Sequence, residues 1–254
     1  PSQNVVARFQ AVRPKRLIVV TAHYDSGCAS PLSAPTVIPW LRTLNYIVIG
    51  AMALVLATCI SDFIATRNGQ SVEMSMAVRT FGIGVLLSGA LALFMASSRG
   101  EDIRGANGNA SGVTALLGLA ETLGREQPEE ADVWLVATGC HESWMGGMRQ
   151  FLAEHRLDRE NTYILNLEGI GAGEPHVLTE EGMLHALRAN PDMLRHARAL
   201  ADKHGIKEGA MRFVPTEAHV PLMREMKAMT VMGLDEEGLP PHWNQISDRV
   251  TEVE

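Results

Sequence analysis

The stretch "RLIVVTAHYDS", residues 16–26, decides the fold of this chain. Residues 16–23 are nearly continuously apolar and rich in β-branched side chains, a pattern typical of a central strand that is buried on both faces. The run then ends in His-Tyr-Asp-Ser, so polar side chains gather where the strand stops. The stretch predicts a buried strand of a mostly parallel sheet, with functional groups at its carboxyl end.

Strand and helix patterns alternate on both sides of this stretch. The sequence predicts further strands at residues 4–9, 131–138, 162–171 and 228–234. Helices are expected at 110–123, capped by Asn109 or Ser111, at 144–154, and once or twice within 183–204, where Pro191 marks a break or a first helical position. This alternation predicts an α/β fold: a mixed, mostly parallel sheet with helices on both faces.

Length and charge limit the possible functions. The chain has 254 residues, which is enough for one large α/β domain with a substantial core. Its net charge of −7 offers no basic surface for nucleic acid, so we expect no nucleic-acid partner. The three cysteines are far apart and odd in number, which argues against a disulfide framework.

Two long apolar segments interrupt the α/β pattern. Residues 43–61 and 80–98 contain no charged side chain and are each 19 residues long. As a helix, such a segment spans about 28 Å, close to the hydrocarbon thickness of a bilayer. Small residues recur at helix-contact spacing, namely Ala53, Ala57, Gly84 and Ser88. The segments therefore predict a transmembrane hairpin of two closely packed helices.

The hairpin divides the chain into two expected domains. Residues 1–33 and 99–254 form the α/β domain, and the inserted hairpin of residues 34–98 meets the lipid bilayer through residues 43–98. The domain side of the membrane carries more arginines near the apolar segments, which favours a cytoplasmic α/β domain: Arg42, Arg99 and Arg104. Two alternatives stay open: a pair of buried core helices, and a soluble domain whose apolar pair mediates oligomerisation.

Polar side chains follow the ends of several predicted strands. The set is His23, Glu142, Glu168 and His242. Two histidines and two glutamates at one edge of a sheet make a plausible set of metal ligands. Asp25 lies two residues after His23 and is placed to orient its imidazole. Taken singly, each residue has a simpler interpretation, such as a backbone hydrogen bond for His23 or a favourable helix-dipole contact for Glu142.

Five motifs follow one another along the chain: "VVTAHYDS", a Gly-Ala…Asn-Ala-Ser-Gly loop, "VWLVATGCHESWMGG", "ILNLEGIG" and "PPHWNQISD". In this order they resemble the zinc aminopeptidase family. That family includes bacterial leucyl aminopeptidase and aminopeptidase S, with glutaminyl cyclase, glutamate carboxypeptidase and nicastrin as relatives. The resemblance covers almost the whole chain except residues 34–99, and it implies a three-layer, zinc-peptidase-like α/β fold interrupted by a transmembrane hairpin.

The resemblance also implies roles for matching residues. His23 matches a histidine ligand of the family, and Asp25 matches the aspartate that orients this ligand. Glu142 and His242 match two further ligand positions. Glu168 stands where the family has an aspartate ligand, a change that keeps a carboxylate. The resemblance thus implies zinc as the cofactor.

Two matching positions depart from the family's pattern. His141 stands where the family has its general base, the first glutamate of a Glu-Glu pair. Gly108, in the loop "RGANGNASG" of residues 104–112, stands where an aspartate of the family bridges two zinc ions. Two dications about 3.5–4 Å apart repel each other without such a shared anion. We therefore expect one weakly held zinc ion or none, and His141 could become a ligand beside Glu142 and His242.

Further residues are expected around the site. Asp248 matches the acid that follows the family's last histidine. Glu217, where the family usually has Asp, and His219 are expected to line the substrate cleft. The alternative is that Glu217 caps a helix starting near His219.

These expectations lead to one function and one alternative. The first is a membrane-anchored, aminopeptidase-type zinc metallopeptidase that cleaves N-terminal peptide bonds, with impaired or lost activity because of Gly108 and His141. The alternative is an inactive pseudopeptidase that acts as a membrane-tethered binding or assembly subunit, with peptide or protein N-termini, or another membrane protein, as its partner.

Overall fold

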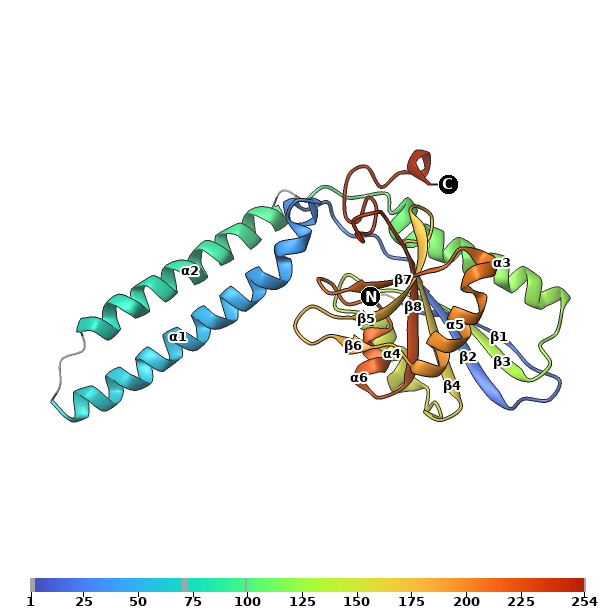
Figure 1. The fold of residues 1–254 in the computed structure, drawn as a ribbon, viewed down its shortest axis with the longest axis horizontal. Helices are drawn as coiled ribbons and strands as arrows, with labels where there is room; N and C mark the ends of the chain where they lie inside the picture. Colours follow the sequence, from blue (N-terminus) through green and yellow to red (C-terminus); the bar gives the residue numbers. More distant parts are fainter. Residues whose placement is uncertain (1–2, 70–72, 99, 254) are drawn as a thin grey trace. The chain divides into compact units, whose positions relative to one another are not determined.

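A computed structural model describes residues 3–69, 73–98 and 100–253. The chain forms two compact units. One comprises Pro1–Ala29 with Glu101–Glu254, and the other comprises Ser30–Gly100. Each unit is described by itself (Figure 1).

The first unit is built on a mixed sheet. Within the described residues the sheet has eight strands, and seven of them run in the order β1 (Val5–Phe9), β3 (Ala131–Thr138), β2 (Arg16–His23), β4 (Thr162–Glu168), β8 (Lys227–Leu234), β5 (Glu174–Glu181) and β6 (Leu187–Arg188). The eighth, β7 (Lys207–Met211), pairs with β5. Strands β3, β2, β4 and β8 are parallel, whereas β1 and β5 join them antiparallel. The predicted mixed, mostly parallel α/β sheet is confirmed.

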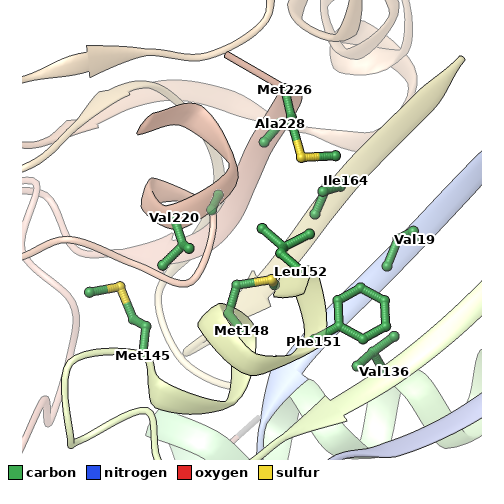
Figure 2. Packing of buried hydrophobic residues seen from close by; sticks show 11 residues of the cluster. Val19, Val136, Met145, Met148, Phe151, Leu152, Ile164, Val220, Met226 and Ala228 are labelled. Atoms are coloured by element: carbon green, nitrogen blue, oxygen red, sulfur yellow. The ribbon is translucent and has the colours of Figure 1, made fainter. Parts of the chain in front are cut away.

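The helices cover both faces of this sheet because successive strand residues point to opposite sides. Val19 of β2 packs on one face with the buried side chains of α4 (Gly146–Glu154) and α6 (His219–Met223). Figure 2 shows Phe151 and Met148 of α4 within this cluster. Val20 packs on the other face with α3 (Ser111–Arg125). Helix α5 (Pro191–His204) lies on that same face, where Leu165 contacts both clusters.

Local geometry corrects two helix predictions. Helix α3 has no side-chain cap, because Asn109 donates to the carbonyl of Tyr24 and Ser111 donates to that of Asn107. Helix α4 begins at Gly146 rather than at residue 144, since Trp144 and Met145 have positive φ angles of 59° and 56°.

Of the one or two helices predicted within residues 183–204, the described chain has one, α5, because residues 183–190 contain β6 and no helix. Helix α5 begins with Pro191, as one of the two interpretations predicted. Its N-cap is Asn190, whose side chain accepts hydrogen bonds from the backbone N–H groups of Asp192 and Met193. The other short elements are η1 (Pro31–Ser33), η2 (Ile38–Trp40), the π-helical turn η3 (Ala106–Ala110) and η4 (Val250–Glu252).

The second unit is a helical hairpin of α1 (Leu41–Arg67) and α2 (Glu73–Ser98). Two segments are long and apolar enough to cross a membrane: Ile38–Arg67, which comprises η2 and α1, and Ser75–Ala96 within α2. Only 11% and 6% of their respective apolar windows is buried. Only the length and composition of these helices indicate that they cross a membrane, so the membrane assignment stays a proposal.

The helix contact within the hairpin differs from the prediction. Gly82 lies against Val55, and Gly89 lies against Val48. Ala53 and Ala57 are exposed, and Gly84 faces open space, so the small-residue contact predicted for that face is wrong. The interface instead uses the face that carries Ala51 and Thr58, which are the buried residues of α1. Asp62 of α1 also pairs with Arg79 and Ser75 of α2.

Candidate metal centre

Three of the predicted site residues meet at the carboxyl edge of the central strands. His23 is the last residue of β2, Glu168 is the last residue of β4, and His141 follows the end of β3 at Thr138. His23 lies opposite Thr138 in the sheet register, so parallel pairing brings these strand ends together. The site therefore lies where β2 is flanked by β3 and β4, the edge at which parallel sheets bind ligands.

His23, His141 and Glu168 form what we call the His-His-Glu cluster. Each can offer a ligand atom such that these atoms all lie within 4.8 Å of one another. The imidazole rings of His23 and His141 stack, with centroids 4.0 Å apart and an interplanar angle of 20°. His141 Nε2 lies 3.9 Å from Glu168 Oε1. His23 and Glu168 are only 5% and 6% exposed, so the cluster is well shielded from water.

Neighbouring polar groups orient each member of the cluster. His23 Nδ1 lies 3.0 Å from the backbone oxygen of Asp25. His141 Nδ1 lies 3.0 Å from Glu217 Oε1. Asn166 donates to Glu168 Oε2 at 3.0 Å. These contacts resemble the outer groups that hold metal ligands in place.

The turn that carries His141 is sharp and depends on glycine. Cys140 has a φ of 55°, and its carbonyl accepts hydrogen bonds from the N–H groups of Ser143 and Gly146. A Cβ at Gly147 would lie 2.2 Å from the backbone oxygen of Gly139, so only glycine fits there. Backbone strain of this kind is common at functional sites. Here it turns the chain back so that His141 reaches β2 and β4.

Asp25 ties this turn to the end of β2. Its carboxylate accepts hydrogen bonds from the backbone N–H groups of His141 and Glu142, at 3.0 and 3.1 Å. Burial by itself would raise the pKa of Asp25, but hydrogen bonds from His23 and from the two backbone N–H groups outweigh burial and lower the pKa to about 2. Asp25 is therefore a carboxylate at every physiological pH.

His141 lies among acidic side chains. Burial alone would lower the pKa of its imidazole, but the carboxylates of Glu168 and Glu217 outweigh burial and raise the pKa to about 9. In the metal-free protein His141 is thus a cation at neutral pH. Burial raises the pKa of the neighbouring Glu142 carboxyl group.

The other two predicted ligands lie outside the His-His-Glu cluster among the described residues. The Glu142 carboxylate is next to Gly27, where an added Cβ would be 2.8 Å from its Oε1 and 2.6 Å from Asn244 Oδ1. His242 has a φ of 61°, and its Nδ1 lies 2.9 Å from Ser247 Oγ. Their pairing as a second half-site stays a prediction.

The glycine-rich loop is tied down by protein groups. Asp248 is 1% exposed, and its carboxylate accepts hydrogen bonds from the backbone N–H groups of Asn107 and Gly108, at 2.5 and 3.1 Å. Asn107 also donates to the backbone oxygen of Pro241 and accepts from Gly171. Position 108 therefore lies beside a buried carboxylate that comes from Asp248.

Glu217 and His219 were predicted to line the substrate cleft. Glu217 is 0% exposed and contacts His141 through Oε1, whereas its Oε2 has no hydrogen-bond partner in the described part of the chain. His219 begins α6, and its Nδ1 lies 3.2 Å from where a Cβ of Gly182 would be. Glu217 therefore contacts Nδ1 of His141, whereas Glu168 lies near Nε2 of the same ring.

Two groups near the site were not among the predicted site residues. Asn166 supports Glu168 and is itself held by Thr21, whose hydroxyl donates to Asn166 Oδ1 at 3.1 Å. The two-residue spacing of Asn166 and Glu168 on one strand face was an available signal. Glu181 is buried and accepts hydrogen bonds from the hydroxyls of Thr216 and Thr230. Glu181 belongs to the polar strand β5, whose sequence has no pattern indicating that this side chain is buried.

The donor atoms of the cluster suit zinc. Two imidazoles and a carboxylate are among the protein ligand sets of catalytic zinc sites. Glu217 adds a second buried carboxylate beside His141, and its Oε2 has no hydrogen-bond partner among the described residues. A dication is the kind of group that would offset this charge.

The comparisons agree with this architecture. Residues 90–254 match the model of peptidase family M28, which is well over half of the chain. The chain therefore belongs to peptidase family M28. His23 lies outside the matched residues, and the structure brings it to the site. None of the curated proteins matches the sequence significantly.

Solved structures share the fold. BSAP, a zinc aminopeptidase from Bacillus subtilis, superposes with a TM-score of 0.56 at 15% identity, covering 99% of this chain and 45% of its own. LapB from Legionella pneumophila gives 0.59 at 10% identity, with 99% and 50% coverage. A glutaminyl cyclase from an Acidobacteriales bacterium gives 0.55 at 14% identity, with 100% and 67% coverage. The chain thus spans half or less of the first two proteins.

Proposed function

We propose that this protein is a membrane-anchored, aminopeptidase-type zinc hydrolase with impaired activity. The observation that carries the proposal is the His-His-Glu cluster, in which His23 and Glu168 stand at ligand positions of the family and His141 stands in place of its general base. Membership of family M28 and the zinc aminopeptidase among its structural neighbours support the reaction class. Bound zinc would act as a Lewis acid toward the carbonyl of an N-terminal peptide bond.

The surroundings of His141 support impaired activity. A general base must have a ring nitrogen free to accept a proton from the attacking water. His141 Nδ1 lies 3.0 Å from Glu217 Oε1 and its Nε2 lies 3.9 Å from Glu168 Oε1, so carboxylates adjoin both nitrogens. Loss of a general base typically slows a reaction by about 10²–10⁴-fold.

The surroundings of Gly108 support a reduced metal content. A bridging carboxylate is missing at this position, and the nearest acid, Asp248, is engaged by two backbone N–H groups. We therefore expect one weakly held zinc ion or none. Two tightly bound zinc ions per chain, measured by inductively coupled plasma analysis, would overturn this part of the proposal.

The activity is tested with aminoacyl p-nitroanilides in the presence of zinc or cobalt. The double variant Gly108→Asp/His141→Glu restores both family residues and is expected to hydrolyse these substrates at least 10²-fold faster than the unmodified chain. The single variant Gly108→Ala is the control and should gain nothing. A wild-type rate that equals or exceeds that of the double variant contradicts impaired activity.

The alternative function is an inactive pseudopeptidase that binds peptide or protein N-termini as a membrane-tethered subunit, with a further membrane protein as a possible partner. The Glu142, Glu168 and Glu217 carboxylates around the site favour an amine ligand electrostatically. Peptides with a free amino terminus should then bind without turnover and be weakened by N-acetylation. No difference between free and acetylated peptides excludes this alternative.

Membrane anchoring rests on α1 and α2. Their exposed side chains include Leu87 and Leu91, at 65% and 59% exposure. A charge there costs about 2.5–3.5 kcal/mol on insertion scales, so Leu87→Arg should lower the carbonate-resistant fraction in membranes. If the hairpin is a soluble oligomerisation element, the same variant would increase solubility instead. The arginine distribution favours a cytoplasmic α/β domain, which protease protection in vesicles tests.

A further inference from the structure

We infer that His141 is a zinc ligand, so that His23, His141 and Glu168 hold a single ion and Glu217 is the positioning residue behind His141. The inference deepens the proposed function and rests on it for the premise that this site holds zinc. It differs from the sequence expectation, which grouped His141 with Glu142 and His242.

The Nδ1 atoms of both imidazoles make the contacts that are usual for metal-ligating histidines. A ligating histidine usually donates its second ring N–H to a carboxylate or a backbone carbonyl, which fixes the tautomer. His23 Nδ1 lies 3.0 Å from the Asp25 carbonyl oxygen, and His141 Nδ1 lies 3.0 Å from Glu217 Oε1. Donation from both Nδ1 atoms leaves both Nε2 atoms for one ion.

The spacing needs little adjustment to bind zinc. Ligand atoms about 2.1 Å from one zinc ion lie about 3.4 Å apart at tetrahedral angles. His141 Nε2 and Glu168 Oε1 are 3.9 Å apart, and suitable atoms of all three residues lie within 4.8 Å of one another. To bind one ion, the side chains must move by about 1 Å and the stacked rings must tilt, so that the in-plane lone pairs of the two Nε2 atoms point to the same place.

The local charges favour one ion over two. Glu168 and Glu217 face His141 from two sides. Suppose that one dication binds His23, His141 and Glu168, with both imidazoles neutral. The carboxylates of Glu168 and Glu217 then balance its two positive charges. A lone ion has no neighbouring dication to repel it, so it needs no bridging anion at position 108. The changes at positions 108 and 141 thus fit one conversion, from a two-metal to a one-metal site.

The competing site is less well assembled. Glu142 and His242 are outside the His-His-Glu cluster in the described chain. The Glu142 carboxylate lies beside Gly27 and Asn244, and His242 Nδ1 contacts Ser247. In the part of the chain that the structure describes, no hydrogen bond or ion pair joins Glu142 to His242.

Metal binding by the detergent-solubilised full chain tests the inference. Titration with zinc, followed by calorimetry, should give one ion per chain. His141→Ala should weaken zinc binding at least 100-fold, and added imidazole should restore part of it by filling the vacated space. Titration with cobalt should give visible absorption bands of a four-coordinate ion in the wild type, and these bands should be lost in His141→Ala. Thermal unfolding in chelator shows whether the variant folds, and His141→Gln serves if it does not.

Glu142→Ala and His242→Ala are the matched controls and should keep binding within a few-fold of wild type. Glu217→Gln keeps the size of the side chain but removes its charge, and should weaken zinc binding by about 10–100-fold while the cobalt bands persist with shifted positions. A merely structural role for Glu217 would leave the bands unmoved.

The outcomes separate the two proposals. If Glu142→Ala or His242→Ala abolishes binding and His141→Ala does not, or if the wild type binds no zinc, the inference is wrong. The hydrolase proposal is then judged on the Gly108→Asp/His141→Glu variant alone. If zinc binds through His141 but that double variant remains inactive, the inference stands and the proposed function fails.

Discussion

The carboxylate of Asp25 holds the backbone of His141, since Asp25 Oδ1 accepts the His141 N–H at 3.0 Å. Its second oxygen accepts the N–H of Glu142 at 3.1 Å. Asp25 follows β2, whereas His141 follows β3, so one side chain couples two strand ends. The position of His141 in the His-His-Glu cluster depends on this coupling.

Replacing Asp25 with Ala should therefore damage both stability and the metal site. The part-buried N–H of His141 loses its acceptor, which costs about 1–3 kcal/mol, and the more exposed N–H of Glu142 loses its acceptor at a smaller cost. We expect a loss in the free energy of unfolding in chelator and a weaker zinc affinity by calorimetry. Asp235→Ala is the control, because Asp235 also accepts two backbone N–H groups, those of Glu237 and Leu239, outside the cluster. Equal zinc affinities of the two variants would contradict the coupling.

Gly105 should tolerate no side chain. Its φ is 64°, and an added Cβ would lie 1.8 Å from Asn109 Oδ1. Gly105→Ala must displace Asn109 and its hydrogen bond to Tyr24, so we expect a loss of about 2 kcal/mol or more on denaturant unfolding. Gly118→Ala is the matched control on α3, where nothing lies within 4 Å of the added Cβ. It should stabilise the protein by up to about 1 kcal/mol. Similar effects of the two variants would show that the loop is more adaptable than its packing indicates.

A carboxylate at position 108 should be tolerated only with metal. A Cβ at Gly108 lies 3.1 Å from Asp248 Oδ2, so Gly108→Asp brings a second negative charge next to Asp248. We expect a lower melting temperature in chelator and a recovery on addition of zinc, because a cation between the two carboxylates removes their repulsion. Gly108→Ala adds the same Cβ without the charge, so zinc should raise its melting temperature no more than it raises that of the unmodified chain. The idea is refuted by a Gly108→Asp variant that is as stable as Gly108→Ala in chelator.

Glu181 should make the protein less stable as the pH rises. Burial raises the pKa of this carboxyl group from 4.5 to about 7, although hydrogen bonds from Thr216 and Thr230 oppose the shift. The folded state keeps this proton between these pH values, whereas the unfolded state releases it, so this contribution to stability is present below about pH 4.5 and is lost as the pH rises through about 7.

Glu181→Gln removes this titration and should flatten the pH dependence of the unfolding free energy in chelator between pH 5 and 8, with a gain on the order of 3 kcal/mol at pH 8. Glu208→Gln is the control, since Glu208 is exposed and paired with Arg198. A pH profile of Glu181→Gln that parallels the wild type would show that Glu181 titrates normally.

Local sequence patterns determined much of this protein. The apolar run at residues 16–23 is sufficient to predict a buried strand, because a strand covered on both faces must be apolar on both. His23 and Glu168 each end a predicted strand. Because the carboxyl ends of parallel strands meet at one edge of the sheet, both were expected at the same site. The length of the apolar segments predicted two long helices, but the face that their small residues predicted for packing was wrong. The polar strands β5, β6 and β7 were missed, since neighbouring strands rather than their own composition hold them in the sheet.

Only the tertiary structure determined which residues lie next to His141. Its neighbours His23, Glu168 and Glu217 come from three distant segments, and the positive φ of Cys140 turns His141 toward them. After such a turn, the direction of a side chain cannot be predicted from the two-residue period of a strand. Strand register and the Asp25 contacts fix it instead, through hydrogen bonds between residues more than 100 positions apart. The sequence could name the ligand candidates, but long-range pairing chose which three of them meet.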